Sequence, residues 1–280
     1  MTRSKGFSYE YRSPQAAGGL SAGVTAAGEP TNAREAAERK TEIDHTINER
    51  YADWKATRNA SEQRWLDVLE GNLGPYYLPI FKTDKVNGIA TSWDYVEDNP
   101  GLPRVLLLGD SISRGYTLGV RNALVGKANI LRAPANCGST VVALEKLELW
   151  LDGGDWDLIH FNFGIHDRST ADPVYLANLQ TIIDRLRLTG ATLIWGRTTP
   201  SMDGQNAEGY TPERCCELNA LADELMRKNN IVINDLYSLV ADRLEELQLP
   251  KNVHFSDAGN VVLGRWVSEC IESVLALERG

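Results

Sequence analysis

The sequence lacks several features that mark specialised classes of protein. Its 280 residues include only four cysteines, at positions 137, 215, 216 and 270, and their spacing is not that of paired metal ligands. The adjacent Cys215-Cys216 pair is a poor disulfide candidate. We therefore interpret the cysteines as small core residues or as free thiols of a reducing compartment.

Long hydrophobic runs and basic clusters are missing as well. Residues 1–30 contain no apolar run of the length that an export signal or a membrane span needs, so we expect a cytoplasmic protein without a membrane partner. The chain has 29 Lys and Arg against 38 Asp and Glu, a net charge of −9. Nucleic-acid binding depends on clustered basic side chains, so we expect no nucleic-acid partner.

The composition changes twice along the chain. Residues 1–31 are rich in Gly, Ala and Ser, which predicts a flexible tail. Residues 32–73 carry apolar side chains at helical intervals, which predicts one long or two shorter helices with a break near residues 59–61. They could form a lid, a surface for homo-oligomer formation or, as we favour, an extra layer on the core. We expect turn-rich connectors over 74–79 and 93–100 to complete a helical extension over 32–100.

Residues 101–280 alternate between short apolar segments typical of strands and longer segments with helical periodicity. The fold class that this order predicts is α/β, a three-layer α/β/α sandwich with about five parallel strands, because each parallel crossover needs a helix. Strands are predicted near 104–108, 129–132, 157–163, 191–197 and 231–235. Helices are predicted near 117–126, 139–151, 173–189, 211–229, 237–246 and 257–277.

Residues of catalytic type occur in four loops after the predicted strands. The loops contain Gly109-Asp-Ser111, Asn136-Cys-Gly138, Asn162 to Asp167 and Val253 to Gly259. A doubly wound sheet brings such loops together at one edge, although they are far apart in the sequence. Taken alone, Ser111 could simply cap the next helix.

Together the loops contain the groups that acyl transfer requires. Ser111 would be the nucleophile and His254, ahead of the last helix, the base that takes its proton. The backbone N–H groups of Ser111 and Gly138, with a donor from the 164–166 turn, are candidates for the oxyanion hole.

Other polar residues near this edge are weaker candidates. Arg114 and Arg197 could bind an anionic group of the substrate, although solvated surface charge is the more common role. His160 lies within a predicted strand and is expected in the core, and His45 is expected to be exposed. We expect no metal site, because a strand His and a loop His six residues apart share no established ligand geometry.

The four loops resemble the four conserved blocks of the SGNH hydrolase superfamily, also called GDSL esterases and lipases. The resemblance covers about residues 102–278. It implies a flavodoxin-like sandwich that hydrolyses esters without a metal or cofactor, with Ser111 as nucleophile and His254 as base. It also implies an oxyanion hole from the first three blocks, here Ser111, Gly138 and His166. As candidate substrate-binding residues at the same edge we take Asp110, Arg114, Asn136, Asp167 and Arg197.

Two positions depart from the family pattern. His166 stands where the third block normally has Asn, and an imidazole N–H can donate to an oxyanion in the right tautomer. Lys251 stands where the family places its acid, three residues before the catalytic His. Asn252 or a backbone carbonyl could orient the imidazole instead, or Asp257 could supply a carboxylate.

The sequence thus predicts a serine esterase that removes a small acyl group, most plausibly acetyl, from a carbohydrate or another polar metabolite. Two alternatives stay open. The missing acid would suit a catalytically silent relative that binds a glycan or a partner protein, and an acyltransferase would use the same residues with a different acceptor.

Overall fold

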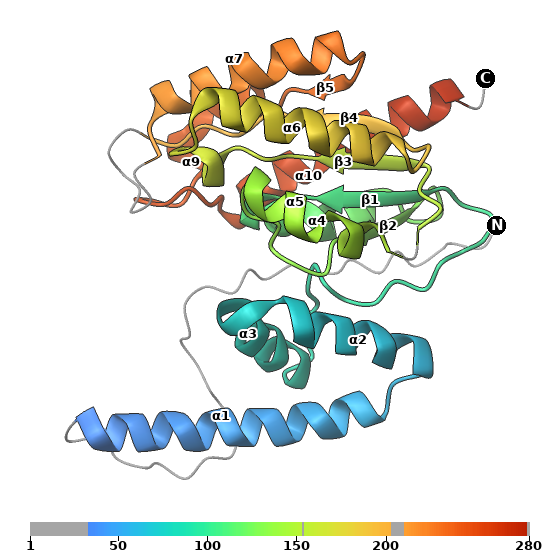
Figure 1. Cartoon of the computed structure of the whole chain (residues 1–280). Helices are drawn as coiled ribbons and strands as arrows, with labels where there is room; N and C mark the ends of the chain where they lie inside the picture. The colour runs from blue at the N-terminus through green and yellow to red at the C-terminus, as the bar shows by residue number, and fades with distance from the viewer. Residues whose placement is uncertain (1–32, 153, 203–209, 279–280) are drawn as a thin grey trace, which may run out of the picture.

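The computed structural model of the chain describes residues 33–152, 154–202 and 210–278, so the predicted tail over 1–31 lies outside the described residues. A parallel sheet with helices on both faces forms the larger part, and three N-terminal helices lie beside it (Figure 1). The predicted three-layer α/β sandwich is confirmed.

The sheet has five strands in the order β2-β1-β3-β4-β5, and every neighbouring pair is parallel. The four aliphatic residues of β1, 105–108, are buried, as expected for the central region of a doubly covered sheet. The strands are β1 (Arg104–Leu108), β2 (Asn129–Arg132), β3 (Leu158–Phe161), β4 (Thr192–Gly196) and β5 (Val232–Asn234).

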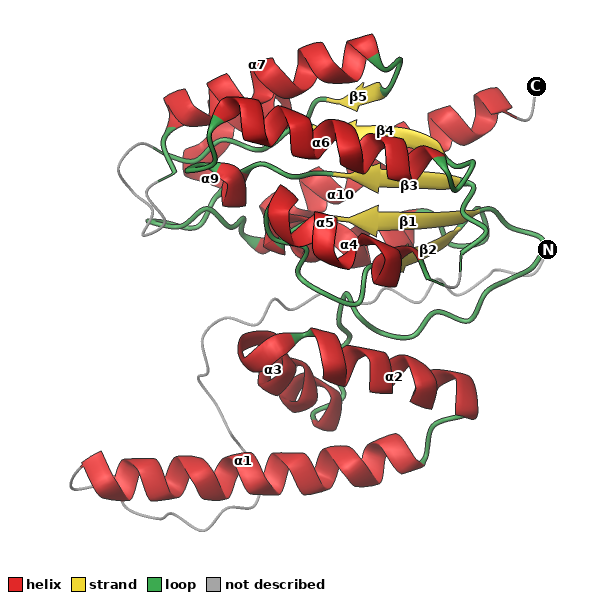
Figure 2. Ribbon diagram, viewed as in Figure 1, coloured by secondary structure: helices red, strands yellow, loops and turns green. Residues whose placement is uncertain are grey.

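Helices cover both faces of the sheet (Figure 2). On one face α5 (Thr140–Leu151), α6 (Asp172–Arg187) and α7 (Pro212–Lys228) pack side by side. On the other, α4 (Ser111–Ala123) packs against α10 (Asp257–Glu278). Short elements complete the sandwich: η1 (Ile165–Asp167), α8 (Leu236–Val240), η2 (Ala241–Arg243) and α9 (Leu244–Leu247).

Two predicted helix boundaries were wrong. The helix expected over 117–126 begins six residues earlier, at Ser111, because Asp110 caps it by accepting a hydrogen bond from the N–H of Ile112. The single helix expected over 237–246 is divided into α8, η2 and α9.

Glycines allow α4 and α10 to pack very closely. A Cβ on Gly115 would lie 2.3 Å from Oδ1 of Asn260, and one on Gly264 would lie 3.3 Å from Cα of Gly119. Side chains at these positions would therefore separate the two helices. This contact fixes α4 relative to α10, and thus the starts of the two helices relative to each other.

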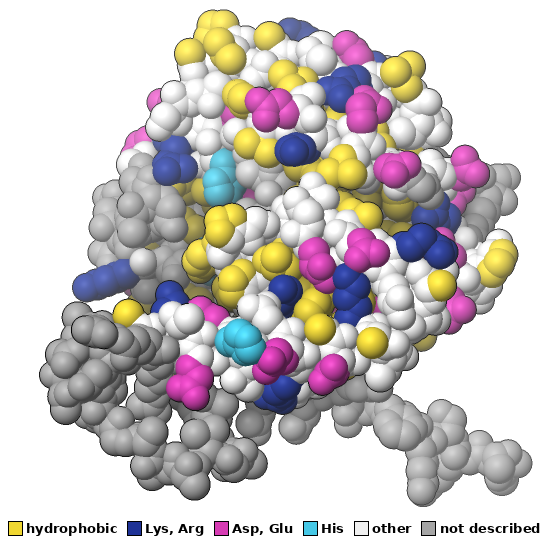
Figure 3. Space-filling model, turned by 60° about the horizontal axis from the view of Figure 1, so that its bottom comes forward, with side chains coloured by type: hydrophobic (Ala, Val, Ile, Leu, Met, Phe, Trp, Pro, Cys, Tyr) yellow, Lys and Arg dark blue, Asp and Glu magenta, His cyan; other side chains and the backbone are white. Residues whose placement is uncertain are grey.

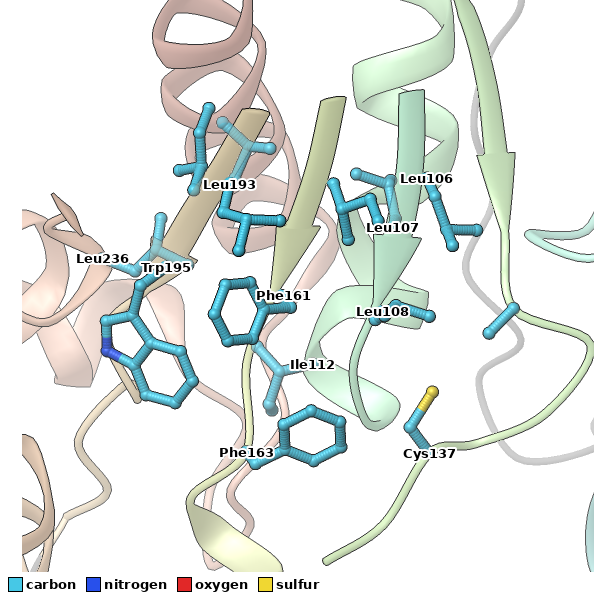
Figure 4. Packing of buried hydrophobic residues seen from close by; sticks show 14 of the residues in the cluster. Leu106, Leu107, Leu108, Ile112, Cys137, Phe161, Phe163, Leu193, Trp195 and Leu236 are labelled. Carbon is cyan, nitrogen blue, oxygen red and sulfur yellow. The ribbon is translucent and has the colours of Figure 1, made fainter. Parts of the chain in front are cut away.

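The core continues to the carboxyl edge of the sheet. Figure 4 shows Phe161, Phe163 and Ile112 together where β1 and β3 end, and the ring of Phe161 packs edge-on against Trp195 at a centroid distance of 5.2 Å. The loops that leave this edge consequently start from close-packed apolar residues.

The N-terminal helices form a small unit with its own core. They are α1 (Ala33–Ala56), α2 (Ala60–Asn72) and α3 (Gly74–Val86). The predicted break is confirmed: Asn59 caps α2 by accepting from the N–H groups of Ser61 and Glu62. The connector expected over 74–79 was wrong, because these residues begin α3, with Pro75 in the first turn, where the missing N–H does no harm. The buried side chains of the unit are Tyr51, Leu66, Leu69, Leu73, Phe81 and Trp93.

Trp93 joins the helical unit to the sandwich. Its carbonyl accepts a 2.7 Å hydrogen bond from Nε1 of Trp65, and the Arg132 guanidinium of β2 lies 5.8 Å from its ring. Arg121 of α4 donates to the carbonyl of Thr91, and Asn129 exchanges hydrogen bonds with the backbone of Asn99. The unit is therefore attached along α4 and the start of β2.

Figure 3 shows the side of the molecule that carries α1, where acidic and basic side chains are interspersed. His45 on α1 is exposed, as predicted, and pairs with Glu49 one turn later. Homo-oligomer formation through residues 32–73 stays a prediction. In the described ranges, no helix combines the length and the hydropathy that crossing a membrane requires.

Replacing Trp93 tests this attachment. Trp93→Ala removes a buried ring from the core of the helical unit, and we expect the free energy of unfolding to fall by about 3–5 kcal/mol. Urea denaturation of the full chain measures the change. Leu188→Ala, at a side chain that is 86% exposed, should change it by less than about 0.5 kcal/mol. A loss below about 1 kcal/mol for the Trp93 variant would contradict this packing.

Candidate active site

Ser111 lies at the carboxyl end of β1, as the first residue of α4. Its backbone N–H belongs to the first helical turn, whose N–H groups have no acceptor within the helix and point their positive dipole ends outward. The residue is 8% exposed, so it is nearly buried at this edge of the sheet. This turn can both present a nucleophile and donate to an anion.

A buried arginine stabilises the turn before Ser111 through hydrogen bonds. Arg132, on β2, donates to the carbonyl oxygens of Gly109 and Asp110 at 3.0 and 2.8 Å and to the hydroxyl of Ser113 at 2.5 Å. Burial lowers the pKa of its guanidinium. These bonds fix the backbone just before Ser111. The sequence analysis missed this role, because an arginine in a strand carries no signal of what it contacts.

His254 meets Ser111 across the same edge. Its Nε2 lies 2.7 Å from Oγ of Ser111, and its Nδ1 lies 2.5 Å from Oδ1 of Asn252. An amide oxygen can only accept, so Nδ1 carries the proton and Nε2 is free to accept from the serine hydroxyl. The tautomer is therefore the one that a general base requires.

The loop that carries His254 is held at both ends. The carbonyl of His254 accepts from the N–H of Leu249 at 2.9 Å, and the N–H of Ser256 donates to the carbonyl of Leu247 at 2.8 Å. Asn252 also accepts from the backbone N–H of His254 at 3.1 Å. Asp257 is the first residue of α10. The structure thus places Asn252 at the imidazole Nδ1, where the family has an acid.

The predicted oxyanion donors lie on three loops. Gly138 has a φ of +69°, which a residue with a side chain rarely adopts, and the preceding Cys137 N–H donates to the carbonyl of Gly109 at 3.2 Å. This bond ties the second loop to the nucleophile turn. His166 lies in η1 with an exposed ring, and that ring makes no hydrogen bond to any residue that the structure describes.

The two aspartates predicted to contact substrate have structural partners. Asp110 is the cap of α4. Asp167 is fully buried, where its carboxylate accepts from the N–H and hydroxyl of Thr140 at 2.9 and 2.6 Å. Burial raises the pKa of Asp167, and these hydrogen bonds oppose the rise. Asp167 therefore joins η1 to the start of α5.

The other predicted binding residues differ in what they contact. Arg197 is paired with Asp223 and Asp235 at 3.2 and 2.9 Å, so its charge is already compensated. Arg114 lies 5.4 Å from the Tyr77 ring centroid and 5.9 Å from that of Trp93, and within the described residues its side chain forms no ion pair or hydrogen bond.

Asn136 and His160 are the last two polar residues that the sequence analysis considered. Oδ1 of Asn136 is buried without a hydrogen-bond partner among the residues described. His160 is a core residue, as predicted: its ring packs edge-on against Tyr116, its Nε2 lies 3.2 Å from Nδ2 of Asn234, and burial lowers its pKa to about 4. The ring is therefore neutral at physiological pH.

One residue near Ser111 comes from outside the sandwich. Tyr77 of α3 contacts Arg114, three residues after Ser111, with its ring centroid 5.4 Å from the guanidinium. The sequence analysis placed it in a connector and assigned it no role. No motif marks a tyrosine that reaches the site from a neighbouring helical unit.

Comparison with known proteins gives a family match for the sandwich. The profile of the GDSL-like Lipase/Acylhydrolase family matches residues 107–262. No curated protein sequence matches the chain.

Two solved structures illustrate the similarity of the fold. A lipase/acylhydrolase from Enterococcus faecalis is 23% identical, with a TM-score of 0.54, and the match covers 61% of this chain and 96% of that one. An acetylxylan esterase from Geobacillus stearothermophilus is 15% identical, with a TM-score of 0.51, over 60% of this chain and 93% of that one.

Exchanging Asn252 for aspartate tests the neutral partner of the imidazole. A carboxylate stabilises the imidazolium, so in Asn252→Asp the acidic limb of the pH profile for Ser111 labelling by a fluorophosphonate should move up by about one pH unit. The initial labelling rate between pH 5 and 9 measures this.

Asn252→Ala serves as the control, because it removes the acceptor without adding charge. We expect its plateau rate to fall at least about tenfold while the midpoint moves less than in the aspartate variant. An unchanged midpoint in Asn252→Asp would mean that this side chain does not hold the imidazole in solution.

Proposed function

Because the chain belongs to the GDSL-like lipase/acylhydrolase family, whose members are ester hydrolases, we propose that it is a serine esterase that removes a small acyl group, most plausibly acetyl, from a carbohydrate or another polar metabolite. Membership confirms the resemblance that the four blocks predicted. The observation that carries the mechanism is the 2.7 Å contact between Nε2 of His254 and Oγ of Ser111.

The proposed cycle has two similar halves. His254 takes the hydroxyl proton as Oγ of Ser111 forms a bond to the ester carbonyl carbon, and the carbonyl electron pair moves to the oxygen. Collapse of this intermediate breaks the bond to the alcohol, which leaves with the proton from His254. Water then attacks the acyl-enzyme, with its proton passing through the same imidazole, and the free acid leaves.

The negative oxygen of the intermediate needs donors in place before the reaction. We assign this role to the N–H groups of Ser111 and Gly138 and to the ring of His166. The first two come from loops joined by the bond from Cys137 to Gly109. The ring of His166 is exposed and makes no hydrogen bond to a described residue, so its N–H can donate to the oxyanion.

Burial of the nucleophile favours a short acyl chain. Ser111 is 8% exposed, and the aromatic side chains of Tyr77 and Trp93 lie near its helical turn, around Arg114. A long acyl chain would have to displace these groups. An acetyl group needs only the space of a few atoms.

A polar alcohol portion is favoured by the groups around the turn. Arg114 Nε and Oδ1 of Asn136 offer a donor and an acceptor that have no hydrogen-bond partner in the described chain. We propose these two, rather than the paired Arg197, as substrate contacts. An acetylxylan esterase among the similar structures gives a carbohydrate acetate as the first substrate class to try.

Aryl esters of increasing chain length and an acetylated xylooligosaccharide test the proposal together. We expect kcat/KM to be highest for p-nitrophenyl acetate, to fall with the butyrate and octanoate, and acetate to be released from the saccharide. Ser111→Ala and His254→Ala should each lower kcat by at least about a thousandfold.

The outcomes separate the alternatives. Full activity of Ser111→Ala would overturn the assignment of the nucleophile. Absence of fluorophosphonate labelling in the wild-type protein would indicate a silent binding protein instead. Labelling combined with a preference for octanoate would retain the esterase and contradict the small acyl group.

A further inference from the structure

Arg132 is a buried cation next to the turn that carries Ser111. The residue is 1% exposed, and its guanidinium is charged because arginine keeps its proton in proteins. In the described ranges it forms no ion pair with a carboxylate, and its partners are two backbone carbonyls and the hydroxyl of Ser113. A positive charge therefore lies in the interior without an anion beside it, where its field is only weakly screened.

One carbonyl that Arg132 contacts belongs to the same peptide group as the N–H of Ser111. Nη2 of Arg132 donates to the carbonyl oxygen of Asp110 at 2.8 Å. The hydroxyl of Ser113 donates to the same oxygen at 2.9 Å and itself accepts from Nη1 of Arg132 at 2.5 Å. The N–H of Arg114 adds the ordinary bond of the first helical turn at 3.1 Å. Hydrogen bonds linked in this way polarise one another, so this carbonyl is strongly polarised.

The N–H at the other end of this peptide group is available for an anion. Among the described residues the Ser111 N–H donates to no acceptor, whereas the N–H of Ile112 donates to the carboxylate of Asp110 at 2.9 Å. That carboxylate therefore caps the helix and does not pair with the arginine. The peptide bond is trans, so its N–H points away from the carbonyl that Arg132 holds.

An aromatic side chain helps to exclude water from the cation. Trp93, which joins the helical unit to the sandwich, is 2% exposed, and its ring centroid lies 5.8 Å from the Arg132 guanidinium. The face of an aromatic ring stabilises a cation without neutralising it. The charge of Arg132 is therefore kept inside the molecule and beside the turn.

We propose that Arg132 is a positioning residue that strengthens the oxyanion hole. Its charge polarises the Asp110–Ser111 peptide group, so that the Ser111 N–H donates more strongly to the negative oxygen of the tetrahedral intermediate. The inference rests on the proposed serine esterase chemistry and deepens it, because it gives the hole a positive charge that never touches the substrate. The charge acts on the intermediate more than on the neutral ester, so it raises kcat and leaves KM nearly unchanged.

Arg132→Gln and Arg132→Lys separate the charge from the hydrogen bonds. Glutamine keeps a neutral N–H donor for the carbonyls, whereas lysine keeps the charge and loses the planar fork. In the glutamine variant we expect kcat for p-nitrophenyl acetate and the second-order rate of fluorophosphonate labelling to fall about 10- to 100-fold, less than for loss of an oxyanion donor itself. Lysine should lower both by less than about fivefold, and KM should stay within about twofold of the wild type in both variants.

Arg121→Gln is the matched control. Arg121 is a second, partly buried arginine that donates to backbone carbonyls, those of Ile130 and Thr91 at 3.0 and 3.3 Å, and burial lowers its pKa to about 10. It lies on α4 about 15 Å beyond Ser111 along the helix. The same loss of charge there should leave kcat and the labelling rate unchanged, even where the melting temperature falls.

Ser113→Ala is a second and milder test. It removes the hydroxyl that links Nη1 of Arg132 to the Asp110 carbonyl, and it leaves the charge in place. We expect kcat and the labelling rate to fall about two- to fivefold at an unchanged KM. If circular dichroism shows that the glutamine variant is unfolded, this variant decides the question, and wild-type kcat in it would overturn the inference.

Three results with folded variants would overturn the inference while leaving the esterase intact. Equal losses in the glutamine and lysine variants would mean that Arg132 only holds the backbone. Wild-type kcat in Arg132→Gln would remove any effect of the charge, and a defect confined to KM would place the effect on substrate binding. Failure of the proposed function would be recognised separately, by activity retained in Ser111→Ala or by a wild-type protein that the probe does not label.

Discussion

Close packing of α4 on α10 is the constraint on which the site depends. Ser111 begins the first of these helices, and His254 lies three residues before the second, 143 residues further along the chain. The contact between Gly119 and Gly264 sets how near the two helices come. This crossing brings their two loops together, with Nε2 of His254 2.7 Å from Oγ of Ser111.

Support for the turn that carries Ser111 comes from both the sandwich and the helical unit. Arg132 holds the carbonyls before Ser111 from inside the sheet, and Trp93 covers that arginine from outside. This turn is therefore enclosed by two layers. This enclosure explains why an aromatic segment that resembles a linker in the sequence is among the most buried parts of the extension.

Much of the sandwich could be predicted from the sequence, because buried parallel strands such as Val105 to Leu108 are nearly continuous apolar runs. The meeting of Ser111 and His254 also followed from strand order. The start of α3 could not be predicted in this way. Gly74, Pro75 and Pro79 are typical of turns, and the helix forms there because Phe81 and its neighbours pack against the other two helices. Likewise, no local pattern shows that Asn252 reaches the imidazole, since a side-chain contact depends on how the loop is folded.

Because the partner of His254 Nδ1 is the amide of Asn252, the three hydrogen-bonded side chains Ser111, His254 and Asn252 carry no net charge at rest. A serine hydroxyl, an uncharged imidazole and an asparagine carry no formal charge. In a triad that ends in a carboxylate, by contrast, a negative charge lies next to the imidazole. A group that approaches these three side chains therefore meets no formal charge on any of them.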